Sequence, residues 1–225
     1  MWMVTRLDVV GAIAAACFVA LPQQEAPAPG IERLVERIQE RYDDASIQAH
    51  FVQHRLSRLG SVMNSAEGEV SIAAPGRMRW EYAGSGQLMV VGGEGREAYL
   101  YIPADNEVHI IQTDEFTPSQ YPFLYLVGRG SLRRDFRVEV VEWSTPLNRN
   151  HVQLELTPRR SGTGIERLIL EVDPLQATIA RLVHFDNLRN AVDYQFHDVQ
   201  FDVEPPDELF EFEIPAGAKK VYVGS

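Results

Sequence analysis

Apolar and polar residues alternate with a period of two along most of the chain, and the pattern is clearest in residues 68–82. There Val70 and Ile72 alternate with small or polar residues, and after a Pro-Gly pair Met78 and Trp80 alternate with charged ones. Alternate side chains of a strand face opposite sides of a sheet, so the stretch predicts two strands with one apolar and one charged face. The Pro-Gly pair predicts a turn slightly wider than the tightest two-residue hairpins.

The same alternation recurs in further segments, which glycines and prolines separate. Near Asp198 the apolar residues change parity, as they would at a β-bulge. Short strands with turns about every eight to twelve residues favour an antiparallel sheet that curls into a barrel. We therefore predict a mainly β protein with a single curled sheet of about 11 strands. The predicted strands are residues 47–56, 66–73, 77–82, 87–91, 98–102, 108–112, 136–142, 151–156, 166–172, 179–186 and 191–203, with a short final strand at 210–214.

Two segments depart from the strand pattern. Residues 31–42 place apolar side chains at three-to-four spacing, which predicts an amphipathic helix. Residues 118–127 form a compact aromatic segment bounded by prolines and a glycine, which predicts a short helix or helical turn.

The N-terminal segment has the features of a secretory signal. Arg6 supplies the positive charge, and the apolar run at 9–21 is too short to span a bilayer as a helix. We predict a signal peptide at 1–21 with an uncertain cleavage point, a Pro/Ala linker at 22–30 and one domain at 31–225. Cys17, the only cysteine, leaves two alternatives open: it is removed with the signal, or it is lipidated and anchors the protein.

Charge and motifs restrict the classes of function. A net charge of −11 disfavours a nucleic-acid or anionic-membrane partner. No sequence motif for a catalytic nucleophile or a phosphate-binding loop is present. His50 and His54 would share one face, but no third ligand accompanies them at the spacing of a zinc site. We therefore expect no catalytic residues, metal or cofactor, and a protein that is not an enzyme. The one basic cluster is best explained as a solvated loop, and it contains Arg129, Arg133, Arg134 and Arg137.

Large, adaptable apolar side chains are abundant on the predicted strand faces. Methionine and aromatic residues line sites that accept varied apolar shapes, but the same residues also fill ordinary cores. The pattern alone leaves both interpretations open. The residues concerned are Met63, Met78, Trp80, Met89, Tyr99, Tyr101, Phe185, Tyr194 and Phe196.

An ordered set of motifs resembles the outer-membrane lipoprotein carrier family. A Pro-Gly pair is followed by a basic residue and by Arg-Trp-Glu-Tyr at 79–82. The resemblance covers roughly residue 31 to the C-terminus, and no single motif is diagnostic. The other motifs, in family order, are Phe51-Val52-Gln53, Tyr99-Leu100-Tyr101, Leu156-Thr157-Pro158, Phe185-Asp186-Asn187, Phe210-Glu211-Phe212 and Pro215-Ala216-Gly217.

The resemblance implies an incomplete barrel whose helices form a lid over a hydrophobic cavity for acyl chains. The family commonly has an arginine before the motif proline, where it holds the lid shut, but this chain has Ala74. Arg77 or Arg79 could replace that arginine in part. The cavity candidates are Met78, Trp80, Met89, Tyr99, Tyr101, Phe185 and Phe196, and the lid candidates are Leu34, Ile38, Phe123, Leu126 and Val127.

The resemblance also implies a function. It predicts a monomeric periplasmic carrier that takes lipoprotein acyl chains from an inner-membrane ABC-type releasing complex to an outer-membrane acceptor. Two alternatives remain: a lipid- or lipoprotein-sensing module of an envelope regulatory system, and a lipid-anchored outer-membrane acceptor that uses Cys17.

Overall fold

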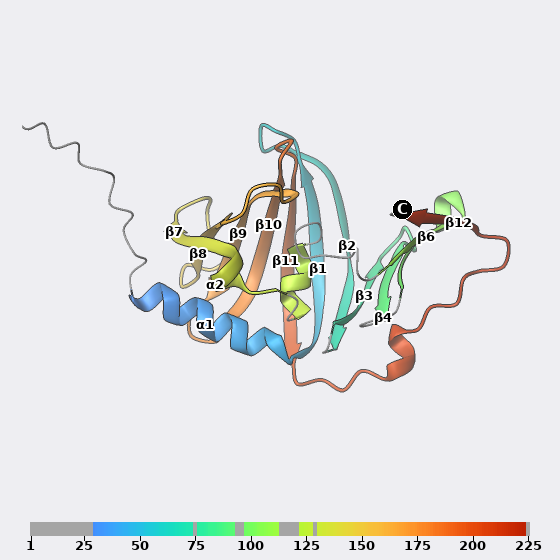
Figure 1. The fold of residues 1–225 in the computed structure, drawn as a ribbon, viewed down its shortest axis with the longest axis horizontal. Helices are drawn as coiled ribbons and strands as arrows, with labels where there is room; N and C mark the ends of the chain where they lie inside the picture. Colours follow the sequence, from blue (N-terminus) through green and yellow to red (C-terminus); the bar gives the residue numbers. More distant parts are fainter. Residues whose placement is uncertain (1–28, 74–75, 93–96, 113–121, 128–129, 224–225) are drawn as a thin grey trace, which may run out of the picture.

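Twelve strands form one strongly curled sheet that does not close into a barrel (Figure 1). The computed structural model describes residues 29–73, 76–92, 97–112, 122–127 and 130–223. The predicted signal peptide, Ala74 and Arg129 lie outside these residues. The strands are β1 Ser46–Leu56, β2 Val62–Ala73, β3 Arg77–Tyr82, β4 Leu88–Gly92, β5 Ala98–Ile102, β6 Glu107–Ile111, β7 Phe136–Val141, β8 Val152–Pro158, β9 Ile165–Asp173, β10 Thr178–Asp186, β11 Ala191–Phe201 and β12 Lys219–Val223.

The order of strands confirms a mainly β protein with an open, curled sheet. The order is β12-β6-β5-β4-β3-β2-β1-β11-β10-β9-β8-β7, so β12 and β7 are the two edges. Neighbouring strands are antiparallel, with one exception: β12 pairs with β6 in parallel, Lys219 opposite Glu107. The prediction of a wholly antiparallel sheet is wrong at this pair, because a long outer connection returns the chain to the edge of β6.

The predicted bulge lies in β11. Gln48 of β1 pairs with Gln200, whereas His50 pairs with His197, so β11 has one extra residue in this interval. Asp198 lies in that interval and has a φ of 51°. The extra residue returns the apolar side chains on both sides of it to the same face of the sheet.

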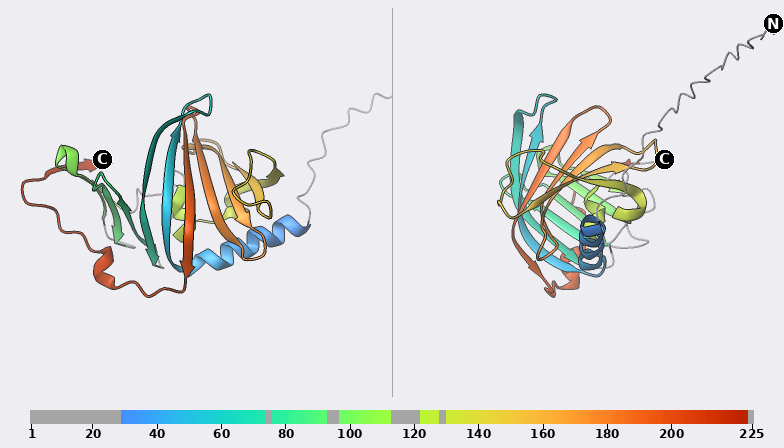
Figure 2. Two further views of the ribbon diagram at one scale, coloured as in Figure 1. Left: turned by 180° about the vertical axis from the view of Figure 1, so that it is seen from behind. Right: turned by 90° about the vertical axis from the view of Figure 1, so that its left-hand side faces the viewer.

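Helical segments cover the concave side of the sheet (Figure 2). The helix α1, Pro29–Asp43, confirms the helix predicted at 31–42, and its apolar stripe is buried. The 3₁₀ segment η2, Pro122–Val127, lies within the second predicted segment, whose residues 118–121 fall outside the description. A one-turn helix that the sequence analysis did not predict, α2 at Leu132–Asp135, follows it.

The strand predicted at 210–214 does not form. Phe210 ends a 3₁₀ turn, η3 Asp207–Phe210, and the residues after it pair with no strand. The ring of Phe212 instead packs against Tyr99 and Tyr101, at centroid distances of 5.3 and 6.1 Å. Phenylalanine and glutamate therefore alternate here because one side of this segment packs on the outer face of the sheet and the other side faces solvent.

The two faces of the sheet carry separate apolar clusters. The larger one occupies the concave side and includes α1, η2 and most of the buried strand residues. The smaller one, which we call the outer cluster, lies on the opposite face of β9–β11. It consists of buried Ile169, Val183 and Ala191, with Leu56, Val141, Trp143 and Phe185 packed against it.

Candidate functional site

Trp80 lies at the centre of an aromatic group on the concave face. Its ring centroid is 4.8 Å from Phe51, 5.5 Å from Tyr194, 5.6 Å from Phe123 and 6.2 Å from Phe196. Only 1% of Trp80 is exposed, and within the described part of the chain its indole N–H has no hydrogen-bond partner. Apolar and ring contacts therefore hold the tryptophan, and these are contacts that an acyl chain could replace.

The strand register explains why Trp80 faces inward. Trp80 pairs with Val70 on one side and with Met89 on the other, and Met78 pairs with Ile72. Directly paired residues share a face of the sheet. Met78, Trp80, Met89 and Phe196 of the predicted cavity set thus lie together on the concave face, with the first two fully buried.

The predicted lid residues also meet in the concave cluster. Leu34, Ile38, Phe123 and Leu126 are all less than one-tenth exposed, and Ile38 is only 1% exposed. The side chain of Val127 lies outside the description. A hydrogen bond of 2.9 Å from the backbone N–H of Leu132 to Gln39 Oε1 links α2 to α1.

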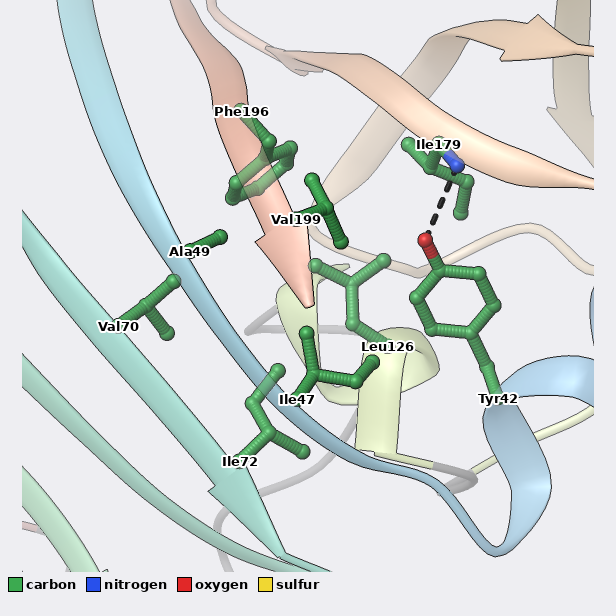
Figure 3. Close-up of a pocket in the computed structure, with 9 residues that line it drawn as sticks. All are labelled: Tyr42, Ile47, Ala49, Val70, Ile72, Leu126, Ile179, Phe196 and Val199. Carbon is green, nitrogen blue, oxygen red and sulfur yellow. Dashed lines mark hydrogen bonds between the residues drawn. The ribbon is translucent and has the colours of Figure 1, made fainter. Parts of the chain in front are cut away.

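Tyr42, which the sequence analysis did not select as a lid residue, connects the lid to the sheet. Its hydroxyl accepts a hydrogen bond of 3.0 Å from the backbone N–H of Ile179 (Figure 3). Its ring packs edge-on against Phe201, with the ring centroids 5.4 Å apart. Arg37 adds a second link, because its guanidinium donates to the carbonyls of Pro174 and Leu175 at 2.9 and 2.6 Å. The only sequence signal for Tyr42 was its position at the end of the apolar stripe of the helix.

Among the described residues, the centre of the covered interior has little free space. A cavity of about 20 Å³ remains between the strands and the lid, and Leu126 reaches into it opposite the strand residues (Figure 3). A second cavity of about 10 Å³ lies between Ile38, Leu126 and Leu168. Each is about the size of one water molecule. Neither of these two cavities can hold an acyl chain unless α1 and η2 move away from the strands. The larger cavity is lined by Tyr42, Ile47, Ala49, Val70, Ile72, Leu126, Ile179, Phe196 and Val199.

Three predicted cavity residues lie on the other face of the sheet. Tyr99 and Tyr101 pair with Val90 and Leu88, which in turn oppose Arg79 and Glu81. Both tyrosines are therefore outside, under Phe212. Phe185 belongs to the outer cluster, where its ring is 6.0 Å from that of Trp143. Assigning these three residues to the cavity was wrong, because alternation places residues on two faces without showing which face is concave.

The two arginines proposed to close the lid also point outward. Arg77 lies 2.5 Å from the carboxylate of Asp207, and Arg79 donates to the carbonyl of Leu209 at 3.1 Å. Both contacts hold the segment that leads to β12. The register therefore contradicts a lid-closing role for these residues. Within the described residues, α1 is held to the sheet by apolar contacts and by the hydrogen bonds of Tyr42 and Arg37.

Buried tyrosines make the folded state sensitive to alkali. Burial raises the pKa of Tyr82 to about 12, and burial likewise raises the pKa of Tyr42 and of Tyr194 well above the usual value. The folded state keeps these phenols neutral, whereas in the unfolded chain they ionise with the usual pKa of about 10. The free energy of unfolding therefore keeps its full value below a pH of about 10 and falls as the pH rises toward the folded-state pKa. We expect the urea midpoint to fall between pH 9 and pH 11, and to fall less in Tyr42→Phe. A constant midpoint would contradict this expectation.

Residues 44–213 match the family described as "Outer membrane lipoprotein carrier protein LolA". The match extends over most of the chain, from the residue after α1 to the segment that follows η3. It therefore includes Trp80, the aromatic residues around it and η2. The chain therefore belongs to the outer-membrane lipoprotein carrier family.

Individual relatives are distant. An outer-membrane lipoprotein carrier protein of Dechloromonas aromatica is 24% identical over 217 residues, which cover 96% of this chain and 99% of the relative. One of Chromohalobacter salexigens is 27% identical over 215 residues, covering 95% and 97%. The crystal structure of an uncharacterized conserved protein from Thermus thermophilus aligns with a TM-score of 0.53 at 14% identity, covering 86% of this chain and 99% of that one. This last likeness shows the fold alone.

Among the described helices, none combines the length and hydropathy needed to cross a bilayer.

Proposed function

We propose that this protein is a carrier that shelters lipoprotein acyl chains in its concave interior. Membership of the carrier family supports the class of cargo. The observation that carries the proposal is the contact between Trp80 and Phe123, at 5.6 Å, where a lid segment lies on the aromatic centre of the concave face. Because this contact is apolar, η2 can move off the concave face and an acyl chain can take its place with few polar groups left unpaired.

The energetics suit a carrier that also releases its cargo. Burying one methylene is worth about 0.8 kcal/mol, so one long acyl chain would gain roughly 12 kcal/mol if fully sheltered. Binding must first displace the lid, and the buried contacts of Ile38 and Leu126 oppose that step. The net affinity is therefore well below the gross gain, which allows the protein to pass its cargo on.

The proposed route follows from the predicted signal peptide at 1–21. After cleavage, the domain at 31–225 would work in the periplasm as a monomer. It would accept lipoproteins from an inner-membrane ABC-type releasing complex and deliver them to an outer-membrane acceptor. The protein would perform no covalent chemistry. Its role would be to keep acyl chains away from water between two membranes.

The cavity assignment predicts selective quenching of one tryptophan. A brominated fatty acid should quench the fluorescence of Trp80 in a Trp143→Phe background, because Trp80 lies at the centre of the concave face. Both variants are made in the protein freed of its predicted signal, which contains Trp2. In a Trp80→Phe background Trp143, on the outer face, should keep its emission. Equal quenching of both, or of neither when binding is shown independently by titration calorimetry, would contradict the proposed location of the acyl chain.

A further inference from the structure

A larger pocket lies on the outer face of the sheet, away from the lid. Its volume is about 330 Å³, which is in the range of small-ligand pockets. It forms where the β1–β2 and β10–β11 hairpins end side by side, since Leu56 of β1 pairs with Ala191 of β11. The residues that line it are Leu56, Ser57, Arg58, Gly60, Trp143, Glu166, Arg167, Phe185, Arg189 and Ala191.

The walls of this outer pocket are aromatic and held in place by arginines. Phe185 and Trp143 stand nearly perpendicular at 6.0 Å and pack against the outer cluster. The guanidinium of Arg167 lies 4.3 Å from the centroid of Phe185, and that of Arg181 lies 4.8 Å from Trp143. The concave interior does not use these side chains.

The β1–β2 and β10–β11 hairpin tips lie at the same end of the sheet (Figures 1 and 2). Each tip carries an exposed leucine. Leu59 is 94% exposed and Leu188 is 66% exposed. Ser57 Oγ accepts a hydrogen bond from the backbone N–H of Leu59 at 3.3 Å, and the Asp186 carboxylate accepts one from that of Leu188 at 2.8 Å. Both turns are thus fixed by capping side chains, so the leucines project from ordered tips.

Each exposed leucine has an arginine beside it in the sequence. Arg58 and Arg189 line the same pocket, and their side chains make no ion pair or hydrogen bond within the described residues. Arg167 is already engaged by Glu155, at 2.7 Å. The remaining charged residue of the rim is the exposed Glu166. Two unpaired guanidinium groups beside apolar tips are complementary to phosphate groups above a hydrocarbon layer.

We propose that this end of the sheet docks on a phospholipid membrane. Leu59 and Leu188 enter the interfacial region, while Arg58 and Arg189 bind lipid phosphates at the mouth of the outer pocket. The overall charge of −11 does not prevent contact at the tips. Charges farther away than the Debye length of about 8 Å in physiological salt are largely screened. The proposal is independent of what the concave interior carries.

The test is flotation of the exported protein, freed of its predicted signal, with vesicles of phosphatidylethanolamine and phosphatidylglycerol. The double variant Arg58→Gln/Arg189→Gln should bind about 25-fold more weakly, at about fivefold per arginine. The double variant Leu59→Ser/Leu188→Ser should bind about tenfold more weakly. Glu166→Gln should bind more tightly, because it removes the negative charge on the rim.

Matched controls come from the same chain. Leu175 is 83% exposed at the β9–β10 turn, and the side chain of Arg33 on α1 is 78% exposed, so Leu175→Ser and Arg33→Gln should bind as the wild type does. Failure of the wild type to float, or equal losses in the controls, would overturn the proposal. Undiminished flotation of the double leucine variant, with displacement by glycerol phosphate, would also overturn it, since it would show an anion site that binds phosphate groups without insertion of the leucines.

Discussion

The Ile38→Ala variant is expected to bind a fluorescent acyl probe at least about tenfold more tightly than the wild type, although its free energy of unfolding is lower. Ile38 is 1% exposed and fills the space between α1 and η2. Truncating such a buried side chain costs about 2–5 kcal/mol. In the proposed carrier mechanism the cost falls on the closed state, because the lid is already displaced when cargo is bound. Tighter binding should also slow the transfer of cargo to acceptor vesicles.

The control for this variant is the same substitution on the other face of the sheet. Ile169 is fully buried in the outer cluster and does not contact the lid. Ile169→Ala should therefore lower the free energy of unfolding by a similar amount and leave the affinity for the probe unchanged. Weaker probe binding by Ile38→Ala would show that Ile38 belongs to the ordinary core and would refute the lid mechanism.

Replacing Glu171 by alanine should lower the free energy of unfolding by about 3 kcal/mol or more. The carboxylate of Glu171 is fully buried and accepts hydrogen bonds from the backbone N–H of Leu147 at 2.6 Å and from Gln153 Nε2 at 3.1 Å, while His151 Nδ1 lies 3.0 Å away. Hydrogen bonds to a charged group are worth about 1.5–3 kcal/mol each, and their loss leaves buried donors unpaired.

Urea denaturation followed by circular dichroism measures this effect. Glu166→Ala, which removes an exposed carboxylate a few residues earlier in β9, should change the free energy of unfolding by less than about 0.5 kcal/mol. A loss below about 1 kcal/mol in Glu171→Ala would mean that the loop between β7 and β8 is held by other contacts.

Strands that carry a clean alternation could be predicted from the sequence with little error. β3 and β5 have the predicted bounds, and the parity change at Asp198 correctly located a bulge. The predicted strand that does not form is one in which apolar and polar residues alternate for another reason. Phe210 and Phe212 alternate with glutamates because one side of an outer segment rests on the sheet. The parallel β12 had no distinguishing signal, because its partner β6 is far away in the sequence.

The site was less predictable than the fold. Local alternation correctly placed Trp80 and Met78 with Val70 and Ile72, because one hairpin relates them. It could not relate that hairpin to Phe185, whose face depends on the register of β9–β11. The covering of the concave side by α1 and η2 came from the family resemblance, since a helical apolar stripe does not say which surface it covers.

The contacts of Arg77 and Arg79 on the outer face of the sheet affect how the protein can assemble. β12 reaches β6 through a long irregular connection, so the β12 of one molecule could equally pair with the β6 of another and form a swapped dimer. The contacts of Arg77 with Asp207 and of Arg79 with Leu209 tether that connection to its own sheet. Tethering raises the effective concentration of β12 at its own β6 far above that of a neighbouring molecule. The arginines first considered for closing the lid thus favour strand pairing within one molecule over strand exchange.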